Sequence, residues 1–446
     1  MSDPVSPAAE PSAPSASPLA HTAAAPRRPS LWRHADYVKI WSAATVSLLG
    51  SAISTLAIPY LAAAILRASP LEVALLGTVQ MAPFIIFTLP AGAWLDRVRR
   101  RPVLIAGDLG RGLALLTIPV AYVAGVLTIW QLYVVALVTG FLTVLFDVAD
   151  QSYLPALVDR EDLVQGNAKL SLSQSSAQIV GPGLGGGLVG LVGAPFAVIA
   201  DAVSFFISGG LISLIRKPEA KPERRRAEDG SHTSLRHEIA EGLRYVLGNQ
   251  HLRMIAASTA TSNLGTSLAY AVFPIFVYVE LGLKPELIGL AMGLGSFGLL
   301  LGAAVASPLT KRFGVGPMIV GSMFINGPGV ILVAFLPREA LVAGPLLLTS
   351  EFLIGLSAIV YNVNQVSFRQ AITPLEMQGR MNATMRFVVW GIMPVGSLAG
   401  GLLASFLPIR TTILIGALIA STAFLWVLLS PVRSLREMPT GATAQD

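Results

Sequence analysis

A cluster of charge between two long apolar runs constrains this chain more than any other feature. The runs cover residues 71–95 and 103–123, and each is long enough for a helix to cross a bilayer, which takes about 20 residues. The segment from Gly92 to Pro102, where the runs meet, contains four arginines. Because arginine-rich loops stay on the cytoplasmic side of a membrane, this segment predicts a helical hairpin with its turn in the cytoplasm.

The composition limits what the chain can do. It is 53% hydrophobic and 13% charged, whereas about a quarter of the residues of a typical soluble domain are charged. The net charge of +6 comes from loops next to apolar runs rather than from a basic domain, so no nucleic-acid partner is predicted. With no cysteine and five scattered histidines, we expect no metal site, no cofactor and no enzymatic activity.

The whole chain repeats the pattern of apolar runs separated by polar connections. Lipid offers no partner for unpaired backbone groups, so each run is predicted to be a helix. The predicted fold class is therefore an all-α membrane protein with twelve transmembrane helices. The runs lie near residues 39–65, 71–95, 103–124, 129–149, 165–191, 194–215, 252–279, 286–308, 315–336, 341–364, 379–406 and 409–430.

Basic residues divide unequally between the two sides of this arrangement, which places both termini in the cytoplasm. We expect a monomer in the inner or plasma membrane, surrounded by the lipid bilayer. The predicted divisions are a disordered tail at 1–35, a six-helix bundle at 36–215, a cytoplasmic linker at 216–250, a second six-helix bundle at 251–430 and a cytoplasmic tail at 431–446.

An internal repeat supports the division into two bundles. A shift of 215 residues pairs Asp147 with Asn362 and Gly181 with Gly396. The same shift pairs Gly140 with Gly355, Asn167 with Asn382, and the glycines at 185–186 with those at 400–401. A constant offset across four helices indicates two parallel six-helix repeats, an architecture found among secondary transporters.

The arginine-rich loop resembles a signature of the major facilitator superfamily, Gly-x-x-x-Asp-Arg-x-Gly-Arg-Arg/Lys, with Arg99 in place of the second glycine. The resemblance implies that Asp96 caps a helix of the other half. It also implies that Arg100 pairs with an acid at the end of the fourth span, holding the cytoplasmic gate closed when the transporter faces outward. The alternative is a loop that only sets the topology. The gating residues are Gly92, Asp96, Arg97, Arg100, Asp147 and Asp150.

A second motif lies on the fifth predicted span. Gly181, Pro182, Gly185 and Gly186 permit a kink and a close approach between helices. They resemble the Gly-Pro-x-x-Gly-Gly signature of antiporters in the superfamily, which implies export; the alternative is ordinary packing of small residues. Together with Pro155–Val158, Asn167 and Asp201–Ser208, the motif resembles the drug- and siderophore-exporting branch, which includes macrolide efflux proteins and the enterobactin exporter. The resemblance covers roughly residues 35–430.

Ionisable residues inside apolar spans are costly and usually functional. Asp108 and Arg111 are three residues apart and share a helix face, so they form either a structural ion pair or a proton-coupling site. Glu351 lies near the membrane midplane, where a carboxyl group suits proton exchange; the alternative is a structural acid with its hydrogen bonds satisfied. Arg386 either neutralises Glu351 or binds an anionic substrate. Asp201 fits a packing or capping acid as well as a coupling one.

These features together predict a secondary transporter that works by alternating access. We expect it to export amphipathic small molecules, such as drug-like compounds or siderophores, in exchange for protons. The alternative is a proton- or sodium-coupled uptake symporter on the same fold, against which the antiporter-like motif argues.

Overall fold

The computed structural model describes residues 31–95, 98–159, 162–219 and 235–437, and in these residues the regular secondary structure is helical. The helices of the first half are α1 (Ala35–Tyr60), α2 (Pro70–Leu95), α3 (Arg100–Val123), α4 (Ile129–Leu157), α5 (Leu163–Val192) and α6 (Ala194–Ser213). Those of the second half are α7 (Leu235–Gly248), α8 (Gln250–Ala271), α9 (Pro285–Gly295), α10 (Phe297–Phe313), α11 (Val315–Ala334), α12 (Ala340–Ile372), α13 (Leu375–Ala404) and α14 (Ile409–Leu428).

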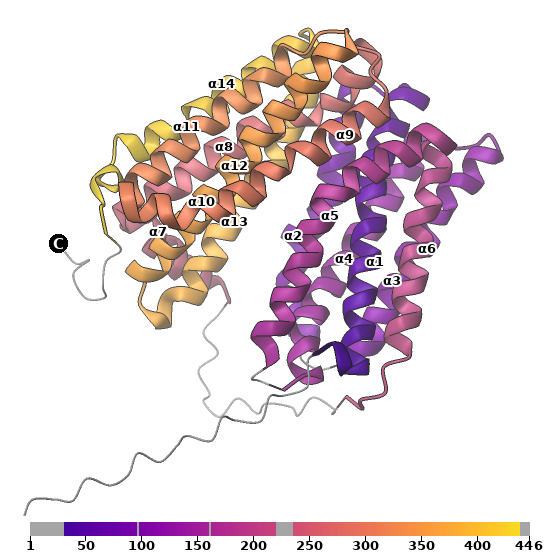
Figure 1. The fold of residues 1–446 in the computed structure, drawn as a ribbon, viewed down its shortest axis with the longest axis horizontal. Helices are drawn as coiled ribbons and strands as arrows, with labels where there is room; N and C mark the ends of the chain where they lie inside the picture. Colours follow the sequence, from indigo (N-terminus) through magenta and orange to yellow (C-terminus); the bar gives the residue numbers. More distant parts are fainter. Residues whose placement is uncertain (1–30, 96–97, 160–161, 220–234, 438–446) are drawn as a thin grey trace, which may run out of the picture.

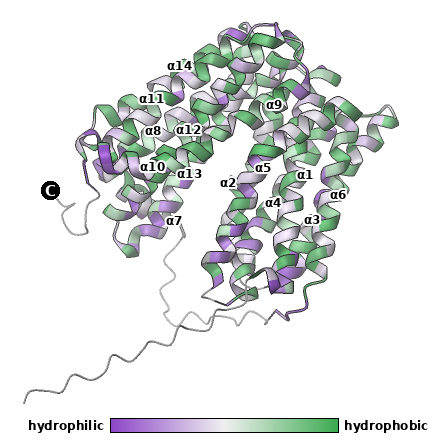
Figure 2. Ribbon diagram, in the orientation of Figure 1, coloured by the Kyte–Doolittle hydropathy of each residue, from purple (hydrophilic) through white to green (hydrophobic). Residues whose placement is uncertain are grey.

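The prediction of a twelve-helix membrane protein is confirmed. Eleven stretches in the described part of the chain are long and apolar enough to span a bilayer. The twelfth span is α5, whose 30 residues include a polar first half that lowers its hydropathy. Large apolar side chains such as Val120, Trp130 and Phe387 are more than 60% exposed on the outer surface, as expected for side chains that face lipid. Figure 2 shows hydrophobic residues along the helices and hydrophilic ones gathered near several helix ends.

The helices form two bundles, which Figure 1 shows as indigo to magenta and as orange to yellow. We call the end of the bundles that contains Arg99–Arg101 and Arg216 the basic end. Within each bundle the first helix packs closely against the last, α1 against α6 and α8 against α14. The two bundles meet through α5 against α9 and α2 against α13.

These contacts between bundles lie at the end of the molecule opposite the basic end, which we call the sealed end. The rings of Tyr60, where α1 ends, and Tyr278, after α8, stand edge to face with centroids 4.8 Å apart. The hydroxyl of Ser397 on α13 donates to the carbonyl oxygen of Ala74 on α2 at 2.9 Å. In Figure 1 the ribbons meet near α9 and diverge toward α7 and the start of α1. The structure is therefore closed at one end.

Two details differ from the predicted spans. The eighth span is broken at Ser296 into α9 and α10, and π-helical turns follow α1 and precede α9. The predicted linker contains α7, an amphipathic helix that packs on α13 through an ion pair of 2.8 Å between Glu241 and Arg380. The linker thus contains an ordered helix that docks on the second bundle.

Candidate transport site

A cavity of about 570 Å³ lies between the bundles, next to the sealed end. Both bundles contribute to its wall, which is mostly apolar and aromatic with a few amide and hydroxyl groups, and its described lining carries no charged side chain. The lining residues are Leu48, Ser51, Ala52, Thr55, Leu56 and Pro59 of α1, Gln174, Ala177, Gln178 and Pro182 of α5, and Tyr270, Phe273, Pro274, Tyr278, Met292, Ser296 and Leu299 of the second bundle. An apolar wall with sparse polar groups is typical of a site for an amphipathic ligand.

Glu351 lies behind this wall and is hydrogen-bonded to one of the residues that form it. The hydroxyl of Tyr270, a cavity-lining residue, donates to Oε1 of Glu351 at 2.7 Å. Glu351 is half-buried on α12, where its Cβ packs against the backbone at Gly295, the last residue of α9. The phenol of Tyr270 therefore connects the Glu351 carboxyl group to the cavity.

The structure does not bring Arg386 to Glu351. Among the described residues the two form no ion pair within 4.0 Å, and the exposed guanidinium of Arg386 lies 5.4 Å from the ring centroid of Trp390 on its own helix. The expectation that Arg386 neutralises Glu351 is therefore wrong for this conformation. Packing between helices, which determines whether the two side chains meet, is not visible in their sequence positions.

The predicted pair of Asp108 and Arg111 forms a buried ion pair with 2.5 Å between Oδ1 and Nη2. The guanidinium lies 4.3 Å and 4.2 Å from the ring centroids of Phe146 and Phe205, so two aromatic faces hold it. Asp108 Oδ2 and Arg111 Nε lack a hydrogen bond of normal geometry to the described residues. Burying both charges is costly for a purely structural interaction.

Three more carboxylates lie near this pair, of which Asp201 is buried, Asp150 is half-buried and Asp147 is exposed. Asp147, Asp150 and Asp201 all interact electrostatically with Arg111. We call these residues, with Asp108, the Arg111 cluster. Asp147 and Asp150 were expected to pair with Arg100, but no described lysine or arginine lies within 4.0 Å of either carboxylate.

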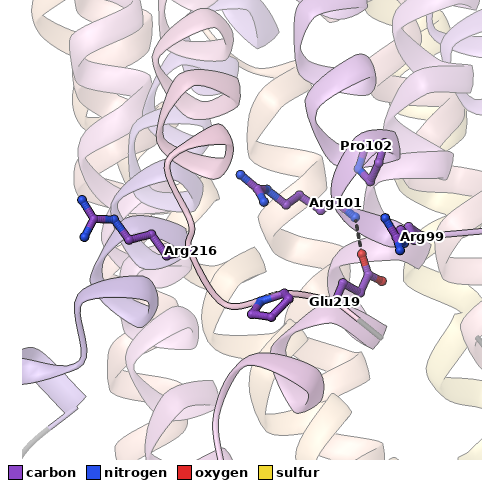
Figure 3. Close-up of a pocket in the computed structure, with 6 residues that line it drawn as sticks. Arg99, Arg101, Pro102, Arg216 and Glu219 are labelled. Carbon is purple, nitrogen blue, oxygen red and sulfur yellow. Dashed lines mark hydrogen bonds between the residues drawn. The ribbon is translucent and has the colours of Figure 1, made fainter. Parts of the chain in front are cut away.

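The arginine-rich loop is bound by the start of the linker instead. Backbone N–H groups of Arg100 and Arg101 donate to the Glu219 carboxylate at 2.8 and 3.1 Å, so Glu219 caps the N-terminus of α3. Figure 3 shows the bond from Arg101 to Glu219, in a pocket of about 310 Å³ lined also by Arg99 and Arg216. Arg99 takes the N-cap position with φ −69° and ψ 135°, a conformation that needs no glycine. Asp96 and Arg97 lie outside the described residues, and Gly92 has open space at its Cβ position.

The glycine motif on α5 lies where three helices cross. Cβ atoms at Gly181 and Gly185 would strike α1 of the same bundle at Ala52 and Ile53. A Cβ at Gly186 would strike α9 of the other bundle, 3.0 Å from the Cα of Gly289. Close helix approach, the packing alternative for this motif, is therefore present.

The second repeat builds the same junction. Gly396 and Gly400 on α13 pack against the backbone of α8, while Gly401 packs against α2 of the first bundle, with its Cβ position 3.0 Å from the Cα of Leu71. Each bundle therefore uses two glycines for its own first helix and a third for contact with its partner bundle.

Sequence reasoning missed several groups that the fold brings to the site. Gln174 and Gln178 line the cavity from α5, and their spacing of four residues, which places them on one face of the helix, was the available signal. Glu219 and the Tyr270 bond to Glu351 had no such signal, because each joins segments more than 80 residues apart.

Comparison with known proteins identifies the family. A family model described as transmembrane secretion effector matches residues 24–444. The chain belongs to this family of the major facilitator superfamily. It is a membrane transporter rather than an enzyme, as the sequence predicted.

Two curated relatives align over most of their length. The multidrug efflux pump Tap of Mycolicibacterium fortuitum is 27% identical over 383 residues, which cover 83% of this chain and 90% of the relative. Macrolide efflux protein A of Streptococcus pyogenes is 25% identical over 413 residues, covering 91% and 98%. Among solved structures, a bacterial homologue of the iron transporter ferroportin in an inward-facing state has a TM-score of 0.66 at 19% identity, with 90% of this chain and 100% of that chain covered, and shows the shared fold.

Proposed function

We propose that this transporter exports amphipathic small molecules, such as drug-like compounds or siderophores, across the inner or plasma membrane in exchange for protons. The observation that carries the proposal is the cavity between the bundles, whose wall is apolar and aromatic and has the Glu351 carboxyl group directly behind Tyr270. The relatives named as multidrug and macrolide efflux proteins support export as the direction of transport.

The arrangement of charge supports a cytoplasmic basic end. Arg99–Arg101, Arg216 and Lys217 gather there in the first bundle, and Lys311 and Arg312 occupy the same end of the second. Because cytoplasmic loops carry the excess of lysine and arginine, both termini lie in the cytoplasm. The sealed end then faces outward, and the conformation is inward-facing, ready to take up substrate from the cytoplasm or the inner leaflet.

In this proposal the arginine-rich loop closes the basic end in the opposite conformation. Gly92, Asp96, Arg97 and Arg100 belong to that loop, and Asp147 and Asp150 are its acidic partners on α4. The lack of an ion pair between Arg100 and these acids fits an inward-facing state, in which the gate is open. The glycine junctions of α5 and α13 support the rocking of one bundle against the other.

Proton exchange is proposed to use Glu351 in the second bundle and the pair of Asp108 and Arg111 in the first. A carboxyl group that binds either a proton or a cationic group of the substrate couples the two fluxes. Arg386 remains outside this pathway in the inward-facing conformation because its side chain is exposed and lies over Trp390.

The test uses energised inverted membrane vesicles that contain the parent or the Glu351→Gln variant. A macrolide and a tetracycline are added, and the internal pH is followed with a fluorescent dye. Export by antiport predicts that the drug enters the vesicle while protons leave, and that Glu351→Gln abolishes this release. Glu339→Gln is the matched control, because Glu339 is exposed at the start of the same helix. Protons and drug moving in the same direction would show a symporter instead.

A further inference from the structure

Asp201 connects the Arg111 cluster to the transport cavity. It lies on α6 and is 2% exposed. On one side its Oδ1 accepts from the hydroxyls of Ser51 on α1, at 3.4 Å, and of Ser204, at 3.3 Å. Ser51 lines the cavity. On the other side the Arg111 guanidinium of α3 lies against α6, 4.2 Å from the ring centroid of Phe205, close enough to attract the Asp201 carboxylate on the same helix. One buried carboxyl group thus joins two regions that the helix framework otherwise separates.

The residues of the Arg111 cluster and Ser51 lie at increasing distances from the basic end. Counted from the basic end at about 1.5 Å per residue, Asp150 is the shallowest of the five and Asp201 is the deepest. Asp108, Asp147 and Arg111 fall between them on α3 and α4. Ser51 lies deeper still on α1. The polar groups form a series through the first bundle, from the basic end to the cavity.

The charges in this series do not balance. Four carboxyl groups share a single guanidinium, and α1 contributes only the Ser51 and Ser54 hydroxyls next to Asp201. The ionisable groups that face Asp201 from α3 and α4 are those of the Arg111 cluster, while α5 has its Lys169 near the basic end, stacked on Trp32. Like charges that share a site oppose one another's ionisation, which favours protonation of one of the carboxyls.

The second bundle shows that the helix framework does not need these charges. At the same repeat positions it has neutral residues. The equivalents of Asp108, Arg111, Asp147, Asp150 and Asp201 are Met323, Asn326, Asn362, Gln365 and Gly416. Packing alone therefore does not explain why the first bundle keeps five ionisable residues at these positions, three of which (Asp108, Arg111 and Asp201) are buried.

We propose that Asp201 carries protons between the Arg111 cluster and the transport cavity through the Ser51 hydroxyl. Protonated Asp201 gives its proton to the Ser51 oxygen as the Ser51 hydroxyl gives its own proton to a water molecule in the cavity, so Asp201 ends as a carboxylate, the water as hydronium and the serine as it began. The first bundle then has a proton pathway of its own beside Glu351. The direction of proton flow rests on the proposed export function, whereas the ability of Asp201 to hold a proton does not.

The first experiment is a pH titration of the purified full chain followed by infrared spectroscopy of the protonated carboxyl stretch. We expect Asp201→Asn to remove one component of this band. Ser51→Ala should keep that component but shift the pH at which it disappears, because its hydroxyl partner is gone. Ser47→Ala is the matched control: Ser47 lies one turn away on α1 and its hydroxyl donates to the Ala44 carbonyl. An unchanged band in Asp201→Asn would overturn the proposal.

The second experiment measures drug-driven proton release in vesicles. In Asp201→Asn and in Ser51→Ala the rate should fall at least about tenfold, the effect of about 1.4 kcal/mol on a barrier, with Ser47→Ala like the parent. Downhill movement of drug along its own gradient should continue in Asp201→Asn, because the cavity wall is unchanged. Proton release at the parent rate in Ser51→Ala would overturn the link to the cavity. Failure of the parent to exchange protons would overturn the proposed function, while the infrared result still decides whether Asp201 holds the proton.

Discussion

The two bundles share one helix framework but differ in where they keep charge. In the first bundle Arg111 is buried among four carboxylates. In the second the equivalent position is Asn326, whose amide donates to the Ser262 hydroxyl at 3.0 Å. The Nε2 amide of Gln365, the equivalent of Asp150, donates to Oδ1 of Asn362 at 3.0 Å. Neutral amides thus fill positions that carry charge in the first bundle.

This difference separates what the fold requires from what transport requires. The amides of the second bundle hold these positions without a buried charge, although Gln365 Oε1 has no hydrogen-bond partner among the described residues. The charged version differs in that Asp108 and Arg111 must be desolvated as ions, which costs several kcal/mol for each buried charge. We expect charge that is retained at such a cost to serve proton movement. Substitutions at equivalent positions of the two bundles test this difference.

The largest effect is expected at Arg111. Arg111→Met leaves Asp108 buried without its cation, and breaking a buried ion pair costs about 3–5 kcal/mol. Asn326→Leu at the equivalent position removes one hydrogen bond and leaves Ser262 unsatisfied, for about 1–3 kcal/mol. The measurement is the free energy of unfolding in detergent. The Arg111→Met loss should shrink as pH falls, because protonation neutralises the unpaired carboxylates. Equal losses at both positions would remove the contrast between bundles.

The second largest effect is expected at the glycine junctions of α5 and α13, which are alike in the two bundles. Gly186→Val and Gly401→Val each place a side chain against the partner bundle. Overpacking of this kind costs about 1–3 kcal/mol, which corresponds to a shift of about 5–150-fold in the equilibrium between the two conformations. We expect both variants to open the sealed end to a similar extent. Gly187→Val is the control, since its Cβ position has no neighbour within 4 Å.

The absence of cysteine makes this measurable. A single cysteine in place of Thr55 in the cavity should react faster with an impermeant maleimide added from the outer side in both glycine variants. A faster reaction in only one of them would show that the two junctions are not equivalent. Unchanged labelling in both would contradict the role of these glycines in closing the sealed end.

Much of the fold was predictable because its signals can be read directly from the order of residues in the chain. Hydropathy located the spans, the offset of 215 residues located the repeat, and a spacing of three residues placed Asp108 beside Arg111. The remaining features depend on how helices pack. Glu351 meets Tyr270 rather than Arg386 because α8, not α13, presents a side chain to it. The docking of α7 likewise depends on a contact between distant segments, the ion pair of Glu241 with Arg380.

The smallest effect is expected at the basic end, where the two bundles cap equivalent helices with and without a charged group. The N-terminus of α3 is capped by the Glu219 carboxylate. Its repeat equivalent α11 has a backbone cap, in which the Gly316 N–H donates to the Leu435 carbonyl at 2.9 Å. Glu219→Gln keeps an acceptor for α3 but removes the charge, so the free energy of unfolding should fall by about 0.3–1 kcal/mol at low ionic strength.

The dependence of this stability loss on salt concentration shows whether the loss is electrostatic. A carboxylate that interacts with a helix dipole at a partly exposed site is screened, since the Debye length falls to about 3 Å at 1 M ionic strength. The parent and Glu219→Gln should therefore converge in stability as salt rises, in unfolding curves recorded at both extremes. A deficit of constant size would mean that Glu219 acts through geometry, as the Leu435 carbonyl does at α11. The two bundles would then differ in charge only at the Arg111 cluster.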